Sequence, residues 1–191
     1  MMLPKNVVDT VIKHVKELDT SRKALQGLSA EILSASKRAI FAFHRGDENV
    51  ANEELATARE KLAKGTEMVK KESRLACEGM WRACQEEFCE ASLLAQYLAT
   101  RKVGRVTEIA DDPELFLGGL SDFTGELVRR AVLVASERDR EQVERIFEDV
   151  RETIDFLLRM DLTGTLRTKL DQAKQNLRKL EEIRYELAIR A

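Results

Sequence analysis

Apolar residues recur at alternating intervals of three and four along most of the chain, which is the spacing of one face of an α-helix. No proline interrupts residues 5–45. In that segment the spacing is kept by Val8, Val11, Val15, Leu18 and Leu25. The pattern predicts one long amphipathic helix over residues 5–45.

The same pattern, together with residues that start and stop helices, predicts further helices over residues 50–69, 72–100, 113–137, 141–160 and one that begins after Thr163. The clearest start is the tripeptide Asp112-Pro113-Glu114, which supplies an N-cap, a proline at the first position and an acid in the first turn. Leucines of the last segment keep close to a heptad seam, so this helix is expected to pack along another. We therefore expect an all-α, single-domain bundle of about six to seven helices over residues 1–191, with long first and last helices.

The composition agrees with a folded helical protein. Of 191 residues, 43% are apolar, 35% charged and only 5% aromatic, a mix that disfavours a sheet protein and a disordered chain. No apolar run reaches the ~20 residues of a membrane span, and the first residues lack the apolar region of a signal peptide, so we expect a cytoplasmic protein with no membrane partner. A net charge of -2 means that a polyanion partner needs a local basic surface, or an assembly that concentrates one.

The three cysteines do not indicate a metal site. Cys77, Cys84 and Cys89 have no CxxC spacing and lie far from His14. A zinc site is therefore disfavoured, and we expect reduced, buried thiols.

Two acids lie in a segment that otherwise resembles a protein core. Residues 115–136 contain four charges, where an average composition would give roughly eight. Among them, Asp122 and Glu126 would lie ~40° apart on a helix, one turn above the other. They are level with glycines at which another helix or a ligand can approach closely, namely Gly118, Gly119 and Gly125.

A second pair of acids, Glu87 and Glu90, would lie ~60° apart just before a charge-free half-helix, so we expect partial burial. Burying a carboxylate costs free energy unless the group is protonated, paired with a cation or bound to a metal. If four carboxylates converge, a divalent ion is the simplest way to offset their mutual repulsion. Oxygen ligands alone suit magnesium or manganese. Such an ion acidifies a bound water and stabilises charge on a phosphate during in-line attack.

The alternative is that these acids are structural and pair with basic residues such as Arg82, Arg129 or Arg130. A di-iron centre is less favoured still, because the Glu-x-x-His motif of such bundles is absent.

Basic residues near the end of the first helix are candidates for nucleic-acid contact: Lys37, Arg38, His44 and Arg45. His44 is equally compatible with an ordinary capping or surface position. A further basic group over residues 59–74 is interleaved with glutamates and is interpreted as a solvated helix face. Trp81 beside Arg82 could stack on bases, although a lone tryptophan in a bundle is more often core or subunit interface.

The segment LGGLSDFTGEL at 117–127 resembles the signature of the translin superfamily in its TRAX (translin-associated factor X) form. Three further segments resemble the first-helix motif, the paired-glutamate segment and the C-terminal helix of that family: SKRAIFAFHR at 36–45, EFCEA at 87–91 and KLEEIRYELAIR at 179–190. The likeness spans nearly the whole chain.

The resemblance implies an all-helical bundle that assembles into a hollow octamer, and a place beside the RNA-silencing machinery. It also implies a nuclease, because the catalytic acids of TRAX match Glu87, Glu90 and Asp122, with Glu126 as a neighbouring acid, whereas translin lacks the two glutamates. The Trp81-Arg82 pair is more like translin. This mixture is expected of a self-assembling archaeal form, with a translin-type partner subunit left open.

The leading hypothesis is a magnesium-dependent endoribonuclease, with manganese as an alternative ion, that cuts single-stranded RNA inside a hollow homo-oligomer. Its acids would hold one or two ions, and Lys37, Arg38, His44, Arg45 and Arg82 would contact RNA, with DNA as a second candidate. One alternative is a translin-like shell that binds RNA or single-stranded DNA without cutting it. Another, less favoured, is an all-α nucleoside triphosphate pyrophosphatase, which also gathers acids around magnesium.

Overall fold

The computed structural model describes residues 3–189, which form six α-helices and no strand. A single turn of 3-10 helix, η1 (Ser73–Cys77), lies between the second and third helices. The α-helices are α1 (Lys5–Arg45), α2 (Glu48–Lys71), α3 (Gly79–Thr100), α4 (Pro113–Ser136), α5 (Arg140–Leu157) and α6 (Gly164–Ile189). The predicted all-α class is confirmed, and so is the great length of the first helix.

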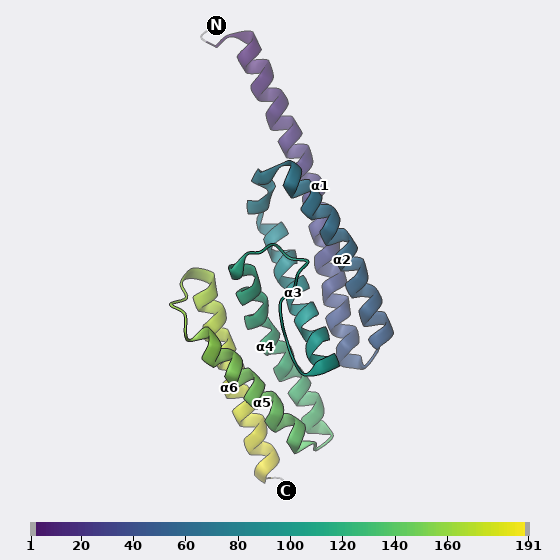
Figure 1. Ribbon diagram of the computed structural model, residues 1–191, viewed down its shortest axis with the longest axis vertical. Helices are drawn as coiled ribbons and strands as arrows, with labels where there is room; N and C mark the ends of the chain where they lie inside the picture. The colour runs from purple at the N-terminus through teal and green to yellow at the C-terminus, as the bar shows by residue number, and fades with distance from the viewer. Residues whose placement is uncertain (1–2, 190–191) are drawn as a thin grey trace.

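The helices form an elongated bundle with α3 and α4 at its centre (Figure 1). Helix α1 packs on α2 and α3 on one side, and α5 and α6 pack on α4 on the other. Helices α3 and α4 pack against each other, α1 packs on α3 and α6 packs on α4, so the central pair is flanked by these two helices. This central pair is the part of the fold that positions the predicted acids.

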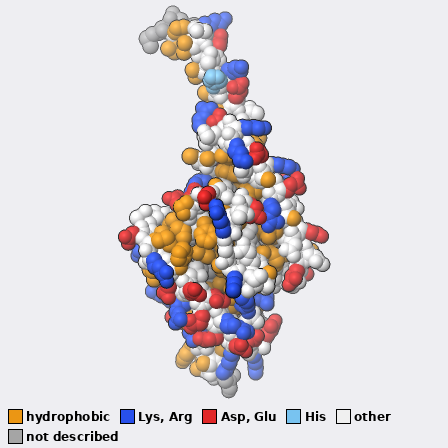
Figure 2. All heavy atoms as spheres, viewed as in Figure 1, with side chains coloured by type: hydrophobic (Ala, Val, Ile, Leu, Met, Phe, Trp, Pro, Cys, Tyr) orange, Lys and Arg blue, Asp and Glu red, His pale blue; other side chains and the backbone are white. Residues whose placement is uncertain are grey.

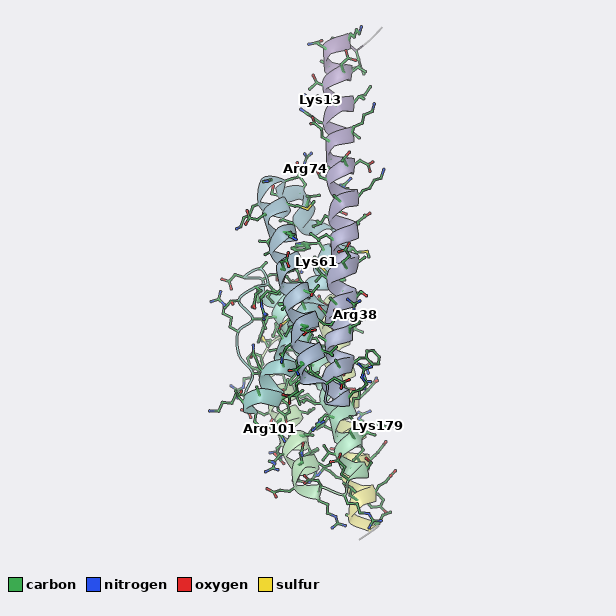
Figure 3. All side chains as sticks on the ribbon, turned by 90° about the vertical axis from the view of Figure 1, so that its right-hand side faces the viewer. Lys13, Arg38, Lys61, Arg74, Arg101 and Lys179 are labelled. Atoms are coloured by element: carbon green, nitrogen blue, oxygen red, sulfur yellow. The ribbon has the colours of Figure 1, made fainter. Side chains whose placement is uncertain are left out.

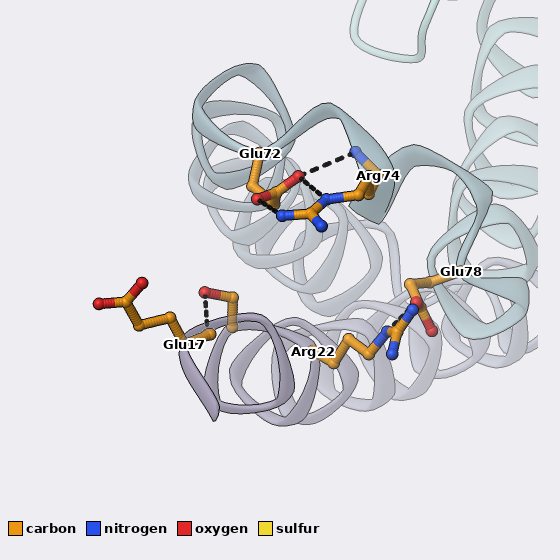
Figure 4. Close-up of polar contacts among 6 residues, drawn as sticks. Glu17, Arg22, Glu72, Arg74 and Glu78 are labelled. Atoms are coloured by element: carbon orange, nitrogen blue, oxygen red, sulfur yellow. Dashed lines mark hydrogen bonds and ion pairs between the residues drawn. The ribbon is translucent and has the colours of Figure 1, made fainter. Parts of the chain in front are cut away.

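The N-terminal part of α1 projects beyond the bundle (Figure 1), and Lys13 lies on it (Figure 3). Its apolar residues Val11 and Val15 are 55% and 60% exposed, whereas burial begins with Leu25. Near this transition the Arg22 Nε donates a hydrogen bond of 2.7 Å to Glu78, which immediately precedes α3 (Figure 4). The helical spacing of the first segment was therefore predicted correctly, but its first turns have no core contact among the described residues.

The third helix begins later than predicted, at Gly79 rather than near residue 72. The Glu72 side chain accepts hydrogen bonds from the backbone nitrogen and the guanidinium of Arg74, which favours a tight turn over a continuing helix (Figure 4). The intervening η1 leaves Cys77 exposed, so the prediction that all three thiols are buried is wrong for Cys77 and correct for Cys84 and Cys89.

The start of α4 agrees with the sequence pattern. The Asp112 carboxylate accepts a 2.9 Å hydrogen bond from the backbone nitrogen of Glu114, and Pro113 occupies the first turn. The extended link over residues 101–112 runs back along α3 and ends there, so α4 runs parallel to α3, with its glycine-rich stretch facing that helix (Figure 1).

Glycines set the separation of α3 and α4. A methyl group added at Gly119 would lie 2.7 Å from Cβ of Cys89 and 3.1 Å from the backbone oxygen of Glu86. At Gly118 the added methyl would lie 2.9 Å from Cδ of Glu86. The close approach of a helix that the sequence predicted at these positions is confirmed.

Charges of both signs are spread over the visible face of the molecule, with apolar side chains gathered at mid-height on the left (Figure 2). This mixture matches the near-neutral net charge. Among the described residues, no helix combines the length and the apolarity that crossing a bilayer requires.

Replacing Gly119 by alanine should destabilise the protein, since the new methyl group meets Cys89 and the backbone of α3. Overpacking of this kind costs about 1–3 kcal/mol, partly offset by ~1 kcal/mol of helix propensity. With a net loss of about 1–2 kcal/mol, we expect the Tm measured by circular dichroism to fall by roughly 2–8 °C. Gly27→Ala is the matched control: Gly27 is exposed on α1 with open space around it, so the same change should leave the Tm equal or higher. A Gly119→Ala protein as stable as the control would contradict the packing described.

Candidate functional site

The four acids selected from the sequence share one neighbourhood between α3 and α4. Glu87 and Glu90 come from α3, and Asp122 and Glu126 come from α4. Burial raises the pKa of Glu90 to about 9, and the negative charges of the other three acids act in the same direction. Contacts at the α3–α4 glycines bring the two pairs together.

Glu87 lies at the edge of this cluster, with a side chain 19% exposed. Burial raises its pKa, and the Lys37 ammonium from α1, 3.9 Å away, opposes that rise. Lys37 is itself 53% exposed, so its charge faces both the cluster and the solvent.

The two acids of α4 have cationic or imidazole partners from other helices. Asp122 accepts a hydrogen bond from the Lys169 ammonium of α6. Glu126 shares a hydrogen bond with Nε2 of His44, whose side chain is only 3% exposed. These contacts tie α4 to α6 and to α1 at positions one turn apart.

Glu90 differs from its neighbours, because within the described part of the chain it forms no hydrogen bond or ion pair. Its carboxyl group is removed from water and surrounded by negative charge, so the ionised form is disfavoured. A carboxyl group in this position is neutral at pH 7 unless a cation enters the site.

The oxygen ligands of the cluster are of the type that magnesium and manganese prefer. As the side chains lie, no three acidic, histidine or cysteine groups of the described residues are gathered closely enough to share one ion. Magnesium in proteins is commonly held by one or two carboxylates and completes its shell with water and substrate oxygens. The site therefore fits an ion held by the two glutamates of α3, and does not fit a closed protein cage.

Two of the five basic residues predicted to bind nucleic acid, Lys37 and His44, lie at the acid cluster. For His44 the alternative of an ordinary capping or surface position is wrong, because the ring is buried against Glu126. It lies there because α1 packs on the bundle with this face inward.

The other three predicted basic residues are engaged elsewhere. Arg38 donates to both carboxylate oxygens of Glu54 at 2.7 and 2.8 Å, on the surface shared by α1 and α2 (Figure 3). Arg45 binds Asp47 in the following turn at 3.0 Å. Arg82 pairs with Asp112 at 2.8 Å, near the start of α4.

Trp81 is a core residue, 3% exposed. Its ring fills the space beside Gly65, where an added methyl group would lie 2.3 Å from the ring. An aromatic residue that is open to a ligand lies elsewhere: Phe41 of α1 is 53% exposed, and the Arg129 guanidinium stacks 4.5 Å from its centre.

A model of the Translin family matches residues 9–191, which is nearly the whole chain. The chain belongs to the translin family. It is 28% identical over 188 residues to an uncharacterized protein of Methanocaldococcus jannaschii, covering 94% of this chain and 82% of that relative.

Solved structures support the translin-type fold. The crystal structure of apo-NeC3PO matches with a TM-score of 0.87 and 22% identity, covering 98% of this chain and 99% of that one. AfC3PO matches with a TM-score of 0.84 and 23% identity, covering 95% and 97%, and a structure of AfC3PO with duplex RNA matches with a TM-score of 0.83, also at 23% identity, covering 95% and 96%. At these identities the likeness shows a shared fold.

Sequence reasoning missed two residues of this translin-family site, Glu86 and Lys169. Glu86 precedes the selected pair and is four residues before Glu90, a spacing that places both on one helix face. Lys169 lies beside the leucine seam of the last helix and seven residues before Asn176, which donates to Thr124 of α4. Two polar residues at a heptad interval beside an apolar seam were the available signal.

The raised pKa of Glu90 predicts a pH-dependent loss of stability when no cation is bound. Since the carboxyl pKa is near 4.3 in an unfolded chain and about 9 in the fold, stability due to the protonated group is lost as the pH rises from about 5 through 9. Glu90→Gln stays neutral and avoids this loss. In chelator, its Tm should exceed that of the unaltered protein by several degrees at pH 8.5 and by much less at pH 5.

Glu53→Gln, on an exposed part of α2, is the control and should show no such trend between pH 5 and pH 9. A Tm difference for Glu90→Gln that is the same at both pH values would contradict the burial of an unpaired carboxyl group.

Proposed function

We propose that this translin-family protein is a TRAX-like endoribonuclease that uses magnesium or manganese to cut single-stranded RNA. The observation that carries the proposal is the unpaired, half-buried Glu90 carboxyl group among three other carboxylates. A structural acid in this position would be expected to have a cationic partner, whereas a metal-binding acid needs to be free.

In this proposal Glu87 and Glu90 hold the ion, and Asp122 and Glu126 complete the negative surroundings. A magnesium ion bound to carboxylates places positive charge beside a phosphodiester and makes a coordinated water more acidic. Glu90 would hold the ion as a carboxylate, its proton released to solvent, and the exposed ammonium of Lys37 would bind a backbone phosphate at the rim.

The comparison with AfC3PO bound to duplex RNA supports RNA as the class of substrate. We propose that this protein cuts single-stranded RNA in preference to duplex RNA, so the assay includes a duplex of the same sequence. We further propose a hollow homo-oligomer, an octamer as in the related family, because convergence of several copies of Lys37 would concentrate positive charge that one near-neutral chain lacks. A translin-type partner subunit is a second form of such an assembly.

A second candidate function is a catalytically silent shell that binds RNA. It is favoured by the partners of the α4 acids, since Lys169 and His44 already satisfy Asp122 and Glu126. The two functions make the same prediction for RNA binding and differ in whether magnesium allows cutting.

Glu90→Gln should abolish magnesium-dependent cleavage of end-labelled single-stranded RNA while the protein still binds that RNA. Loss of one of two metal-holding carboxylates is expected to reduce the cleavage rate by roughly 100-fold or more. Glu53→Gln should cut at the unaltered rate, and chelator should stop cleavage by every variant. Gel electrophoresis of the products, filter binding and circular dichroism provide the three readouts.

Intact RNA that is bound in every lane, with or without magnesium, would overturn the nuclease and favour the binding shell. Cleavage that survives Glu90→Gln would overturn the assignment of the site. Duplex RNA of the same sequence cut faster than the single strand would overturn the proposed strand preference.

A further inference from the structure

Lys169 is a largely buried cation placed between carboxylates of two other helices. Its side chain is 18% exposed, and its ammonium lies 3.0 Å from Oε2 of Glu86 on α3 while donating to Asp122 on α4. The same charge acts on Glu87 and Glu90, opposing the rise in their pKa values. Lys169 is thus the ammonium of α6 that faces the acid cluster.

Glu86 is held in position to meet Lys169 by the absence of a side chain at Gly118. The Glu86 carboxyl carbon lies 2.9 Å from the place that a methyl group on Gly118 would occupy. The carboxylate therefore lies directly against α4, beside Asp122. Lys169 completes a row of alternating charges, Glu86, Lys169 and Asp122, across three helices.

This row leaves the cluster divided into two parts. On one side Lys169 neutralises Asp122 and Glu86, and His44 engages Glu126. On the other side Glu87 lies 3.9 Å from the exposed ammonium of Lys37, and Glu90 forms no ion pair among the described residues. A divalent ion placed between Asp122 and Glu86 would have to share their oxygens with the ammonium of Lys169, which repels it.

We propose that Lys169 takes the place of a second metal ion, so that the site holds one divalent ion, at Glu87 and Glu90, together with a resident ammonium. This inference rests on the proposed function, which leaves the number of ions open. The ammonium positions the Asp122 carboxylate and supplies a fixed positive charge within the cluster, with Glu86 as its second anchor.

The test is the number of Mn²⁺ ions bound per chain, measured by equilibrium dialysis and calorimetry on the assembled protein without RNA. The unaltered protein should bind one ion whose binding is lost in Glu90→Gln. Lys169→Met should bind a second ion, or bind the first roughly tenfold more tightly, because a nearby positive charge is gone. Lys169→Arg, which keeps the charge, is the matched control and should bind one ion.

Two site-bound ions in the unaltered protein, or one ion with unchanged affinity in Lys169→Met, would overturn the inference while the proposed function stands. Absence of any ion that depends on Glu90 would overturn the proposed function itself. If Lys169→Met fails to fold, the count in the unaltered protein and in Lys169→Arg still decides the matter.

Discussion

Repulsion among half-buried carboxylates is the constraint around which the centre of this molecule is arranged. Five acidic side chains, two from α4 and three from α3, lie where the helices press together: Glu86, Glu87, Glu90, Asp122 and Glu126. Each would be costly if left charged and unpaired. Lys169 from α6 pairs with Asp122, and Lys37 and His44 from α1 pair with Glu87 and Glu126. Among the described residues, Glu90 has no partner.

The packing of the helices therefore determines how the acidic side chains interact. Gly118 and Gly119 allow α3 to approach α4 closely enough for acids of both helices to act on one another. Helices α1 and α6 contribute more than burial, because they carry the groups that pair with acids of the central helices. An ion that binds Glu87 and Glu90 would remove the imbalance that remains. This imbalance is the physical reason for proposing a cation site, and with it a nuclease, in this translin-family protein.

Much of this arrangement followed from the sequence because it depends on local signals. Helical spacing gave the bounds of α1, and the cap at Asp112 gave the start of α4. The pairing of acids with Lys169 and His44 could not be predicted, because it depends on which faces of α6 and α1 turn inward. An amphipathic pattern fixes the rotation of a helix about its axis only to within tens of degrees. The start of α3 was predicted too early. The composition of residues 72–78 is compatible with a helix, but the hydrogen bonds between Glu72 and Arg74 favour a tight turn there.

The central claim is that the acids of α3 form a cation site, and anomalous diffraction from crystals grown with Mn²⁺ tests it most directly. The account predicts an anomalous peak within bonding distance of carboxylate oxygens of Glu87 and Glu90, with Lys169 still bound to Asp122. Well-ordered carboxylates with no anomalous peak beside them, and Glu90 hydrogen-bonded as a neutral acid, would contradict it.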